Sequence, residues 1–559
     1  MTPIDIPVLI AGGGPVGLLG AHLCERQGLG ALVAERYSGR VGAPKAHALN
    51  SRSLEICHAV GLSIDEIHKV MTPPAEGAHV RFMTNLSGHE IGSLPYERQD
   101  EAVRAFTPWP LINIEQPKFE NILETSLIGA RHVRLQRELE WLGCDMLADS
   151  VVSHLRDHAA GKDIAIRSRY LIAADGAASR VREAAGIKML GPDALAHNIT
   201  IHFEADLRPV IAKKPAILYF LFGMGTGSVL IAYDIARTWV LMHAYNPATQ
   251  SPGDFDLAKC EAIVREAIGA EVPFTIKGTS PWIMTAQVAG QYRSGNTFLT
   301  GDAAHRFPPS GGLGLNTGLA DIENLVWKIA AVERGEASSA LLDTYETERR
   351  QVAQTNTSQS VANAMRLRVL LQALGQDIGR DLDADALAGK LADPAKRAEI
   401  DAAVAYQKDH FDSLRLQLGY IYGEHRTIDD HLPISAFHPR AIPGAYLPHC
   451  GLAGAGSVLD LVSGSGLTLI TGPAANVGTL VTDRTAEPVT PVTEGRDFTL
   501  AEGSWADRMG LSPEGAILVR PDRHILHVAP TFDEAARSAM GAAIEALLGP
   551  ACITLTGAA

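Results

Sequence analysis

Three glycines near the amino terminus have the spacing that lets a protein backbone approach a phosphate group. Gly12, Gly14 and Gly17 form the pattern GxGxxG, and Glu35 follows about 20 residues later. The first glycine of such a pattern permits a tight turn, the second admits a pyrophosphate, and the third lets a helix pack closely on a strand. An acid at that distance accepts a hydrogen bond from a ribose hydroxyl. These residues predict a dinucleotide-binding site.

Such a site needs a strand, a turn and a helix in that order. The run PVLIAG (7–12) is typical of a buried strand, PVGLLGAHLCERQG (15–28) of a helix beginning at Pro15, and ALVAER (31–36) of a second strand. The pyrophosphate would then lie at the helix N-terminus, and Arg36 beside Glu35 is a further cofactor candidate. Nicotinamide and flavin cofactors share this unit, so it does not choose between them.

Two further junctions join an apolar run to an acid and a glycine. In RYLIAADGAASRVREAAG (169–186), Asp175 follows the apolar run and Ser179 is placed to cap a short helix containing Arg182. In TFLTGDAAHRFPPSGGLGLNTGLADIENLVWK (297–328), Asp302 ends a strand and a glycine-rich loop leads into an apolar-periodic helix. Glycines in that loop would let the backbone lie against a flat ring, with the helix N–H groups facing negative charge.

The three patterns in this order resemble the single-component FAD-dependent aromatic hydroxylases, also called class A flavoprotein monooxygenases. The resemblance implies an α/β fold: a Rossmann-like FAD-binding domain with an inserted antiparallel β-sheet substrate domain and a C-terminal thioredoxin-like α/β domain. We expect the FAD-binding domain at 1–185 and 285–370, and the substrate domain at 186–284 with parts of 75–110. A helical connection would follow at 371–440 and the thioredoxin-like domain at 441–559. Because CxxC is absent, we expect no thiol chemistry from that last domain.

The resemblance also implies roles for individual residues. Asp302 would hydrogen-bond the ribityl chain, Gln116 would reach the ribityl or phosphate region, and the loop 311–316 would pass the isoalloxazine. Lys45 stands where relatives most often have arginine, and it lacks the bidentate geometry of that residue. Arg52 is another candidate cation, and His47 is a candidate active-site residue. The predicted cofactor-binding residues are Gly12, Gly14, Pro15, Gly17, Glu35, Arg36, Lys45, Gln116, Asp175, Asp302, Pro309, Gly314, Leu315 and Asn316.

Short alternating apolar runs between the second and third junctions predict an antiparallel sheet with one face over a pocket. Its aromatic residues Tyr219, Phe222, Tyr233 and Trp282, together with Pro308, are the predicted pocket residues. No catalytic base can be assigned from the sequence. His154 and His158 have HxxxH spacing without the acid of a zinc motif, so no metal site is predicted.

By resemblance, NADH or NADPH reduces FAD, O2 adds to the reduced ring as a C4a-hydroperoxide, and one oxygen passes to a phenolic ring. Three alternatives remain open. A nicotinamide dehydrogenase would leave the glycine-rich loop without a purpose. A flavoenzyme of the same fold could oxidise a polycyclic polyketide, including Baeyer-Villiger insertion, since the motifs do not specify the oxygen acceptor. A non-catalytic FAD-binding scaffold is the third.

The composition excludes several classes of partner. Of the 559 residues, 46% are hydrophobic and 20% charged, and the formal charge of −14 offers no basic surface for nucleic acid or anionic membrane. The six cysteines lie far apart, which favours reduced thiols and a cytoplasmic location. We expect a small phenolic or polyketide-like aromatic substrate and a homodimer.

Overall fold

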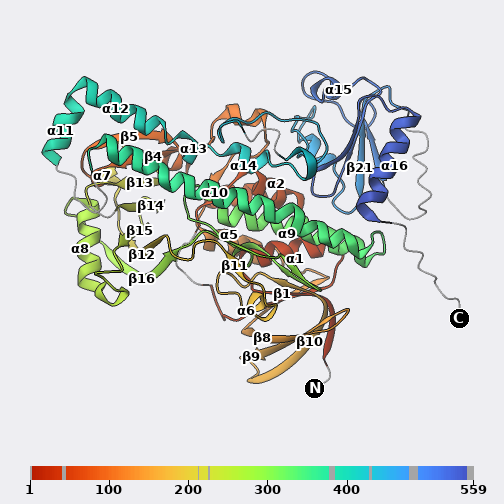
Figure 1. Ribbon diagram of the computed structural model, residues 1–559, viewed down its shortest axis with the longest axis horizontal. Helices are drawn as coiled ribbons and strands as arrows, with labels where there is room; N and C mark the ends of the chain where they lie inside the picture. The colour runs from red at the N-terminus through yellow and green to blue at the C-terminus, as the bar shows by residue number, and fades with distance from the viewer. Residues whose placement is uncertain are drawn as a thin grey trace.

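The computed structural model describes residues 3–40, 46–211, 213–224, 227–376, 384–426, 431–476 and 489–549. Two large sheets lie side by side, and the long helix α10 (Asp343–Ala373) runs across the molecule above them (Figure 1). A smaller α/β region, formed by the carboxy-terminal part of the chain, lies on the right in Figure 1, on the side of the molecule opposite the antiparallel sheet.

The first sheet carries the parallel strands that the glycine junctions require. Its order is β18-β19-β10-β1-β2-β7, and β8 and β9 extend β10 as an antiparallel meander. Four consecutive parallel pairs join β19, β10, β1, β2 and β7. The strands are β1 (Ile4–Ala11), β2 (Ala31–Glu35), β7 (Val133–Arg137), β8 (Leu139–Met146), β9 (Val151–Asp157), β10 (Lys162–Ala173), β18 (Arg293–Ser294) and β19 (Thr297–Leu299).

The three predicted junctions meet at one edge of this sheet because its strands are parallel. Gly12 follows β1, Asp175 follows β10, and Asp302 follows β19. Backbone hydrogen bonds join the strand ends, from Ala174 N to Ala11 O (2.8 Å) and from Thr300 N to Ala173 O (3.0 Å). Segments that are more than 100 residues apart in the sequence therefore surround one position in space.

Two helices cover a face of the parallel sheet at this edge. Helix α1 (Pro15–Arg26) packs on α9 (Leu313–Glu333), and the two approach closely at Gly20. A Cβ at Gly20 would lie 2.9 Å from Cγ1 of Ile322, so the contact requires a residue without a side chain. The other helices of this part are α2 (Ser51–Ala59), α3 (Ile64–Val70), α5 (Gln116–Thr125) and α6 (Arg180–Ala184).

The second sheet is the predicted insertion, with the order β16-β12-β15-β14-β13-β4-β5. Every pair is antiparallel except β13 with β4. Its strands are β4 (His79–Met83), β5 (Glu90–Pro95), β12 (Ala196–Glu204), β13 (Leu218–Leu221), β14 (Ser228–Asp234), β15 (Thr238–Tyr245) and β16 (Thr275–Met284). Strands β4 and β5, from 79–95, show that the chain before residue 186 contributes to the same sheet.

Both faces of this sheet are covered. Helix α8 (Leu257–Ile268) packs on the outer face in a core that includes Phe203 and Trp239. The inner face packs against α10 and against α11 (Ala384–Ala392), α12 (Pro394–Ala405) and α13 (Lys408–Phe411), in a core that includes Phe82 and Phe220. Helix α14 (Leu414–Leu418) then leads toward the carboxy-terminal region.

The carboxy-terminal region has the small α/β architecture that the resemblance implies. Its sheet has the order β22-β21-β23-β24, with one parallel pair followed by two antiparallel pairs. The elements are β21 (Leu467–Thr471), β22 (Val489–Thr493), β23 (Ala516–Val519), β24 (Ile525–Ala529), α15 (Trp505–Arg508) and α16 (Glu534–Leu548). The fold class expected from the sequence is confirmed, while the residue boundaries of the domains stay predictions.

Candidate active site

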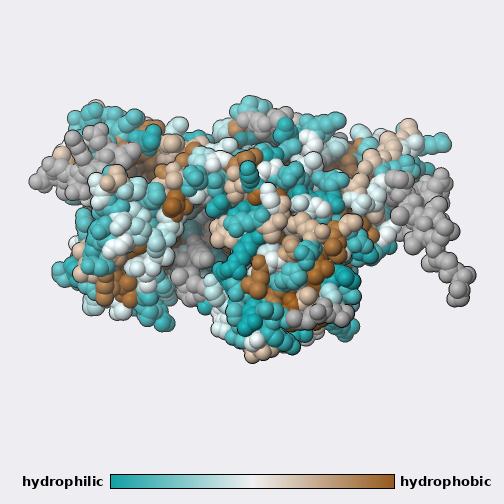
Figure 2. Space-filling view, turned by 60° about the horizontal axis from the view of Figure 1, so that its bottom comes forward, coloured by the Kyte–Doolittle hydropathy of each residue, from teal (hydrophilic) through white to brown (hydrophobic). Residues whose placement is uncertain are grey.

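A cavity of about 770 Å³ joins the carboxyl edge of the parallel sheet to the inner face of the antiparallel sheet. Figure 2 shows a recess in the surface between these two parts of the molecule. Twelve predicted cofactor or pocket residues line the cavity beside the junctions: Gly12, Gly14, Pro15, Glu35, Arg36, Gln116, Asp175, Asp302, Pro308, Pro309, Gly314 and Leu315. The fold thus brings the three motifs to one site.

The glycines at this site are of two kinds. Gly12 has a φ of 107°, and a Cβ there would lie 2.3 Å from the carbonyl oxygen of Ala174; a Cβ on Gly17 would lie 2.0 Å from that of Gly12. These two glycines make room for the protein's own backbone. Gly14 and Gly314 instead have no protein atom within 4 Å of a Cβ. They face open space at the N-termini of α1 and α9, where phosphates and a flat ring fit.

Glu35, the predicted ribose ligand, and Gln116, the predicted ligand of the ribityl or phosphate region, are both held in place by hydrogen bonds within the protein. Glu35 accepts hydrogen bonds from Gly13 N (2.8 Å) and Tyr37 N (2.9 Å), which hold its carboxylate at the cavity wall. Gln116 accepts from Ala46 N (3.3 Å) and donates to Glu120 (2.8 Å). Both side chains are oriented before any ligand arrives, and both belong to the cavity lining.

The second junction, after β10, contains a helix cap at Ser179 and a carboxylate, Asp175, with one oxygen that makes no hydrogen bond. Ser179 caps α6 as predicted, accepting from Arg182 N at 3.0 Å. Asp175 accepts from Val181 N (3.2 Å) through Oδ2, while its buried Oδ1 has no partner among the described residues. Burial raises the pKa of Asp175. A cofactor hydroxyl or N–H group at the cavity wall would satisfy this oxygen.

The side chains of Arg182 and Asn316 hydrogen-bond other protein groups, and neither residue lines the cavity. The guanidinium of Arg182 donates to the carbonyl oxygens of Ala177 (3.3 Å) and Ala303 (3.2 Å), which ties two junctions together. The Asn316 side chain makes four hydrogen bonds, which use its oxygen and its amide nitrogen fully. It accepts from Asn50 N and Ser53 Oγ and donates to Ala48 O and Gly312 O. The side chain of Asn316 therefore fixes the loop, and the role of Asn316 in cofactor binding stays a prediction.

His47 and Tyr96 lie where the glycine-rich loop meets the antiparallel sheet. Both line the cavity, and their rings are 5.6 Å apart. The hydroxyl of Tyr96 lies 3.5 Å from the position that a Cβ on Gly312 would take. His47 Nδ1 lies 3.1 Å from Asn113 Oδ1, and burial lowers the pKa of His47 to about 4. Neutral His47 can therefore hydrogen-bond a ligand but does not carry a charge at neutral pH.

The predicted pocket residues divide between the two faces of the antiparallel sheet. Phe222, Trp282 and Pro308 line the cavity. Tyr219 points to the other face, into the core with α8, and its hydroxyl donates to Lys214 O (2.8 Å). Tyr233 does not line the cavity either; its ring packs edge-on against His47 at 6.2 Å. The prediction of Tyr219 and Tyr233 as lining residues is wrong: strand alternation turns Tyr219 to the other face, and Tyr233 is buried under neighbouring side chains.

Comparison with known proteins agrees with this geometry. The family model described as FAD binding domain matches residues 5–360, and the one described as aromatic-ring hydroxylase, C-terminal, matches residues 440–551. The chain belongs to the FAD-dependent aromatic hydroxylases. It is 31% identical to 4-methyl-5-nitrocatechol 5-monooxygenase of a Burkholderia species, over 98% of each chain. It is 29% identical to 2,4-dichlorophenol 6-monooxygenase of Cupriavidus pinatubonensis, over 98% of this chain and 97% of the relative.

A solved structure of the flavin-dependent monooxygenase PieE, in complex with FAD and substrate, has the same fold. It matches with a TM-score of 0.89 and 31% identity, over 98% of this chain and all (100%) of that one. The hydroxylase described here is thus an FAD-dependent aromatic monooxygenase, and NAD(P)H and O2 are the usual co-substrates of its class. Among the described residues, none of its helices combines the length and the apolar character that crossing a bilayer requires.

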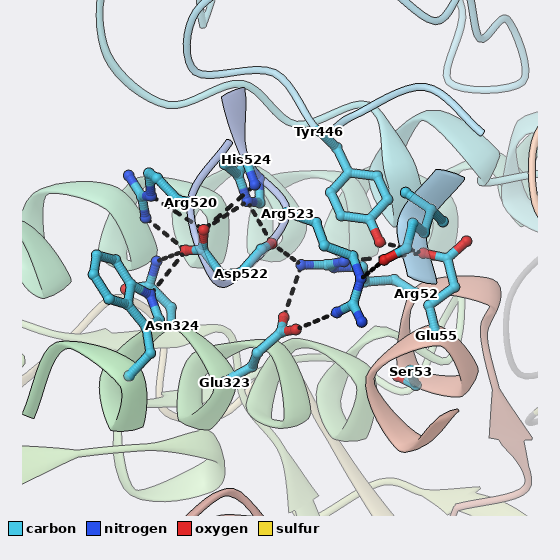
Figure 3. A network of polar contacts seen from close by, with 12 residues as sticks. Arg52, Ser53, Glu55, Glu323, Asn324, Tyr446, Arg520, Asp522, Arg523 and His524 are labelled. Atoms are coloured by element: carbon cyan, nitrogen blue, oxygen red, sulfur yellow. Dashed lines mark hydrogen bonds and ion pairs between the residues drawn. The ribbon is translucent and has the colours of Figure 1, made fainter. Parts of the chain in front are cut away.

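Of the two basic residues predicted near the cofactor, Lys45 and Arg52, only Arg52 can be placed. Lys45 lies outside the described residues. Arg52 is buried away from the cavity and donates to Glu323 on α9 (2.7 Å) and to Asp522 O (2.7 Å), with its guanidinium 3.9 Å from the ring centre of Tyr446 (Figure 3). The expectation that Arg52 is a cation of the cofactor site is therefore wrong. Arg52 joins the FAD-binding part to the turn between β23 and β24.

Several residues of the hydroxylase cavity were not predicted. They include Tyr96, Asn198, Phe220, Met242, Leu367, His410 and Phe411. Phe220 could have been found from its spacing, since it shares a strand face with Phe222. His410 and Leu367 lie on helices, more than 80 residues beyond Met284 at the end of the last strand of the sheet, and no local pattern marks them.

Proposed function

We propose that this hydroxylase inserts one oxygen atom of O2 into a phenolic ring bound on the inner face of its antiparallel sheet. The observation that carries the proposal is that one cavity is shared by the three cofactor junctions and by that apolar sheet face. FAD, when bound, supplies the electron transfer from NAD(P)H and the activation of O2. The chain must then bind both partners, orient them and keep water out.

The junction residues are suited to hold FAD. The open space in front of Gly14 and the N-terminus of α1 suits the pyrophosphate, and Glu35 suits the adenosine ribose. Asp302 suits the ribityl chain, in keeping with the resemblance. Gly314 and Leu315 are the second and third residues of α9, whose N-terminal N–H groups stabilise negative charge on a ring beside them.

The phenol hydroxyl would meet Tyr96 and His47. A phenol reacts as a nucleophile more readily when its proton is withdrawn, so a hydrogen-bond acceptor at the hydroxyl speeds its reaction. Neutral His47 has an acceptor nitrogen for this purpose, and burial raises the pKa of Tyr96 well above its ordinary value. Tyr96 therefore stays a protonated donor, while His47 is the candidate acceptor. The phenyl and aliphatic side chains around them exclude water.

The experiment is NAD(P)H oxidation under air by the FAD-loaded protein with a panel of phenols, followed by product mass. We expect stimulated oxidation and a product heavier by one oxygen atom with its ring intact. Bound FAD without stimulation by any phenol would overturn the proposal. His47→Gln should lower kcat more than KM, while His68→Gln, remote from the cavity lining, should change neither. The homodimer and the cytoplasmic location also stay predictions; sedimentation of the purified protein tests the first.

A further inference from the structure

Two buried polar side chains in the cavity wall have atoms that the protein leaves unsatisfied. Among the described residues, Nδ1 of His410 and Nδ2 of Asn198 have no hydrogen-bond partner. His410 is 2% exposed and Asn198 6% exposed, and both line the cavity. Because an unpaired buried polar group is unfavourable, each of these two atoms is expected to have a hydrogen-bond partner when a ligand fills the cavity.

His410 lies in an aromatic environment. Its ring stacks on Phe411 (4.0 Å between ring centres, 12° between planes) and meets Phe220 edge-on at 6.0 Å. Burial and nearby Arg366 lower the pKa of His410 to about 3, so the imidazole is neutral. A neutral imidazole among phenyl rings suits an uncharged oxygen substituent on an aromatic ligand.

Asn198 lies toward the opposite side of the same sheet face. The register pairs Trp282 of β16 with Asn198 of β12 and Asn198 with Ala244 of β15, and all three line the cavity. His410 packs on Phe220 of β13. From β12 to β13 there are three strand spacings, which is roughly 14 Å. Side chains between the two, including Met242, Val229 and Ile231, are apolar.

We propose that the substrate of this hydroxylase is a flat molecule of more than one fused ring, with oxygen substituents at both ends that hydrogen-bond His410 and Asn198. A single phenol ring spans less than two strand spacings and cannot reach both side chains. The apolar strip between them matches the faces of fused rings. This inference rests on the proposed function, and it selects a substrate class within it.

Binding to the FAD-loaded protein tests the inference without relying on turnover. Phenol, a monohydroxyanthraquinone and a dihydroxyanthraquinone with hydroxyls at opposite ends are titrated while the flavin absorbance is followed. We expect the dihydroxy compound to bind about tenfold more tightly than the monohydroxy compound, because one further buried hydrogen bond forms, and phenol to bind most weakly. Equal affinities for the two anthraquinones, or tighter binding of phenol, would overturn the inference.

Variants identify the two ends. His410→Leu and Asn198→Leu should each remove about the tenfold advantage of the second hydroxyl and change phenol affinity less than twofold. His410→Gln should restore part of the advantage, because glutamine keeps a donor and an acceptor. His449→Gln is the matched control, a partly buried histidine bonded to Ser457 outside the cavity lining. An unchanged advantage in both leucine variants would refute the assignment.

The outcomes separate this inference from the proposed function. Hydroxylation of monocyclic phenols with weak anthraquinone binding would leave the function standing and refute the fused-ring substrate. Tight, His410-dependent anthraquinone binding without NAD(P)H oxidation would support the binding site and refute the hydroxylation. The wild-type comparison of the two anthraquinones needs no variant, so a misfolded variant does not end the test.

Discussion

Replacing Gly314 by alanine distinguishes a glycine kept for a ligand from a glycine kept for folding. Gly314 is the second residue of α9, and a Cβ there would have no protein atom within 4 Å. Alanine is more favourable than glycine in a helix by about 0.5–1 kcal/mol, so the free energy of unfolding of the apoprotein should rise. For a domain of ordinary size this raises Tm by roughly 1–3 °C.

The same methyl group should weaken FAD binding. It projects into the open space of the cavity, where we place the isoalloxazine against the start of α9. A ring displaced from this backbone loses van der Waals contact and about one hydrogen bond to a helix N–H group, worth about 1.4–3 kcal/mol. FAD affinity should therefore fall about tenfold to a hundredfold. Stability and affinity are expected to change in opposite directions.

Thermal unfolding of the apoprotein and titration of FAD by fluorescence quenching measure the two effects. Gly541→Ala is the matched control, since Gly541 lies within α16, has nothing within 4 Å of its Cβ and does not line the cavity. It should raise stability and leave FAD affinity unchanged. If Gly314→Ala binds FAD as tightly as the parent protein, the space in front of α9 is not the cofactor's and the reasoning fails.

Three further predictions follow from the described contacts. Gly17→Ala should destabilise the protein by about 1–3 kcal/mol in urea unfolding, because its Cβ would lie 2.0 Å from Gly12 O; unchanged stability would contradict the packing role. Arg52→Met should cost about 1–3 kcal/mol in the same assay, because Glu323 and Asp522 O each lose one buried donor and keep only Arg523 and His524, yet FAD affinity should stay within about twofold. A large loss of affinity would restore Arg52 as a phosphate ligand. Burial raises the pKa of Glu97 to about 7, above its ordinary value of 4.5, so the folded state holds a proton that the unfolded state has released. The contribution of Glu97 to the free energy of unfolding is thus present below about pH 4.5 and lost as the pH rises to about 7. Glu97→Gln should therefore make the melting temperature fall less steeply over this pH range. An equally steep fall in the variant would show that Glu97 does not cause the pH dependence.

The network in Figure 3 illustrates why some predictions failed. Arg52 follows Ser51 at the start of α2, and the local sequence offers no sign that its side chain points away from the cofactor site. Its partners come from α9 and from the turn at Asp522, about 270 and 470 residues further along the chain. Only the packing of the carboxy-terminal region against the FAD-binding part makes this a buried ion pair.

The sequence by itself determined the local features of the cofactor site, which are its turns, its close backbone contacts, its helix cap and its ribose-binding acid. The turn at Gly12, the close approach at Gly17, the cap at Ser179 and the acid at Glu35 each depend on residues within about 25 positions along the chain, where spacing dictates geometry. Their meeting at one edge was also predictable, since parallel strands end on the same side of a sheet.

Only the tertiary structure decided which side chains face the cavity. Alternation puts Phe220 and Phe222 on one face of β13 and Tyr219 on the other, but all four residues of the strand are buried, so the packing alone decides which face borders the cavity. His410 joins the wall because α13 folds back onto that strand, and Asn316 turns away because Asn50 and Ser53 are there to bond it. In each case the side chain is placed by partners distant in sequence, and these are set by the packing of whole elements.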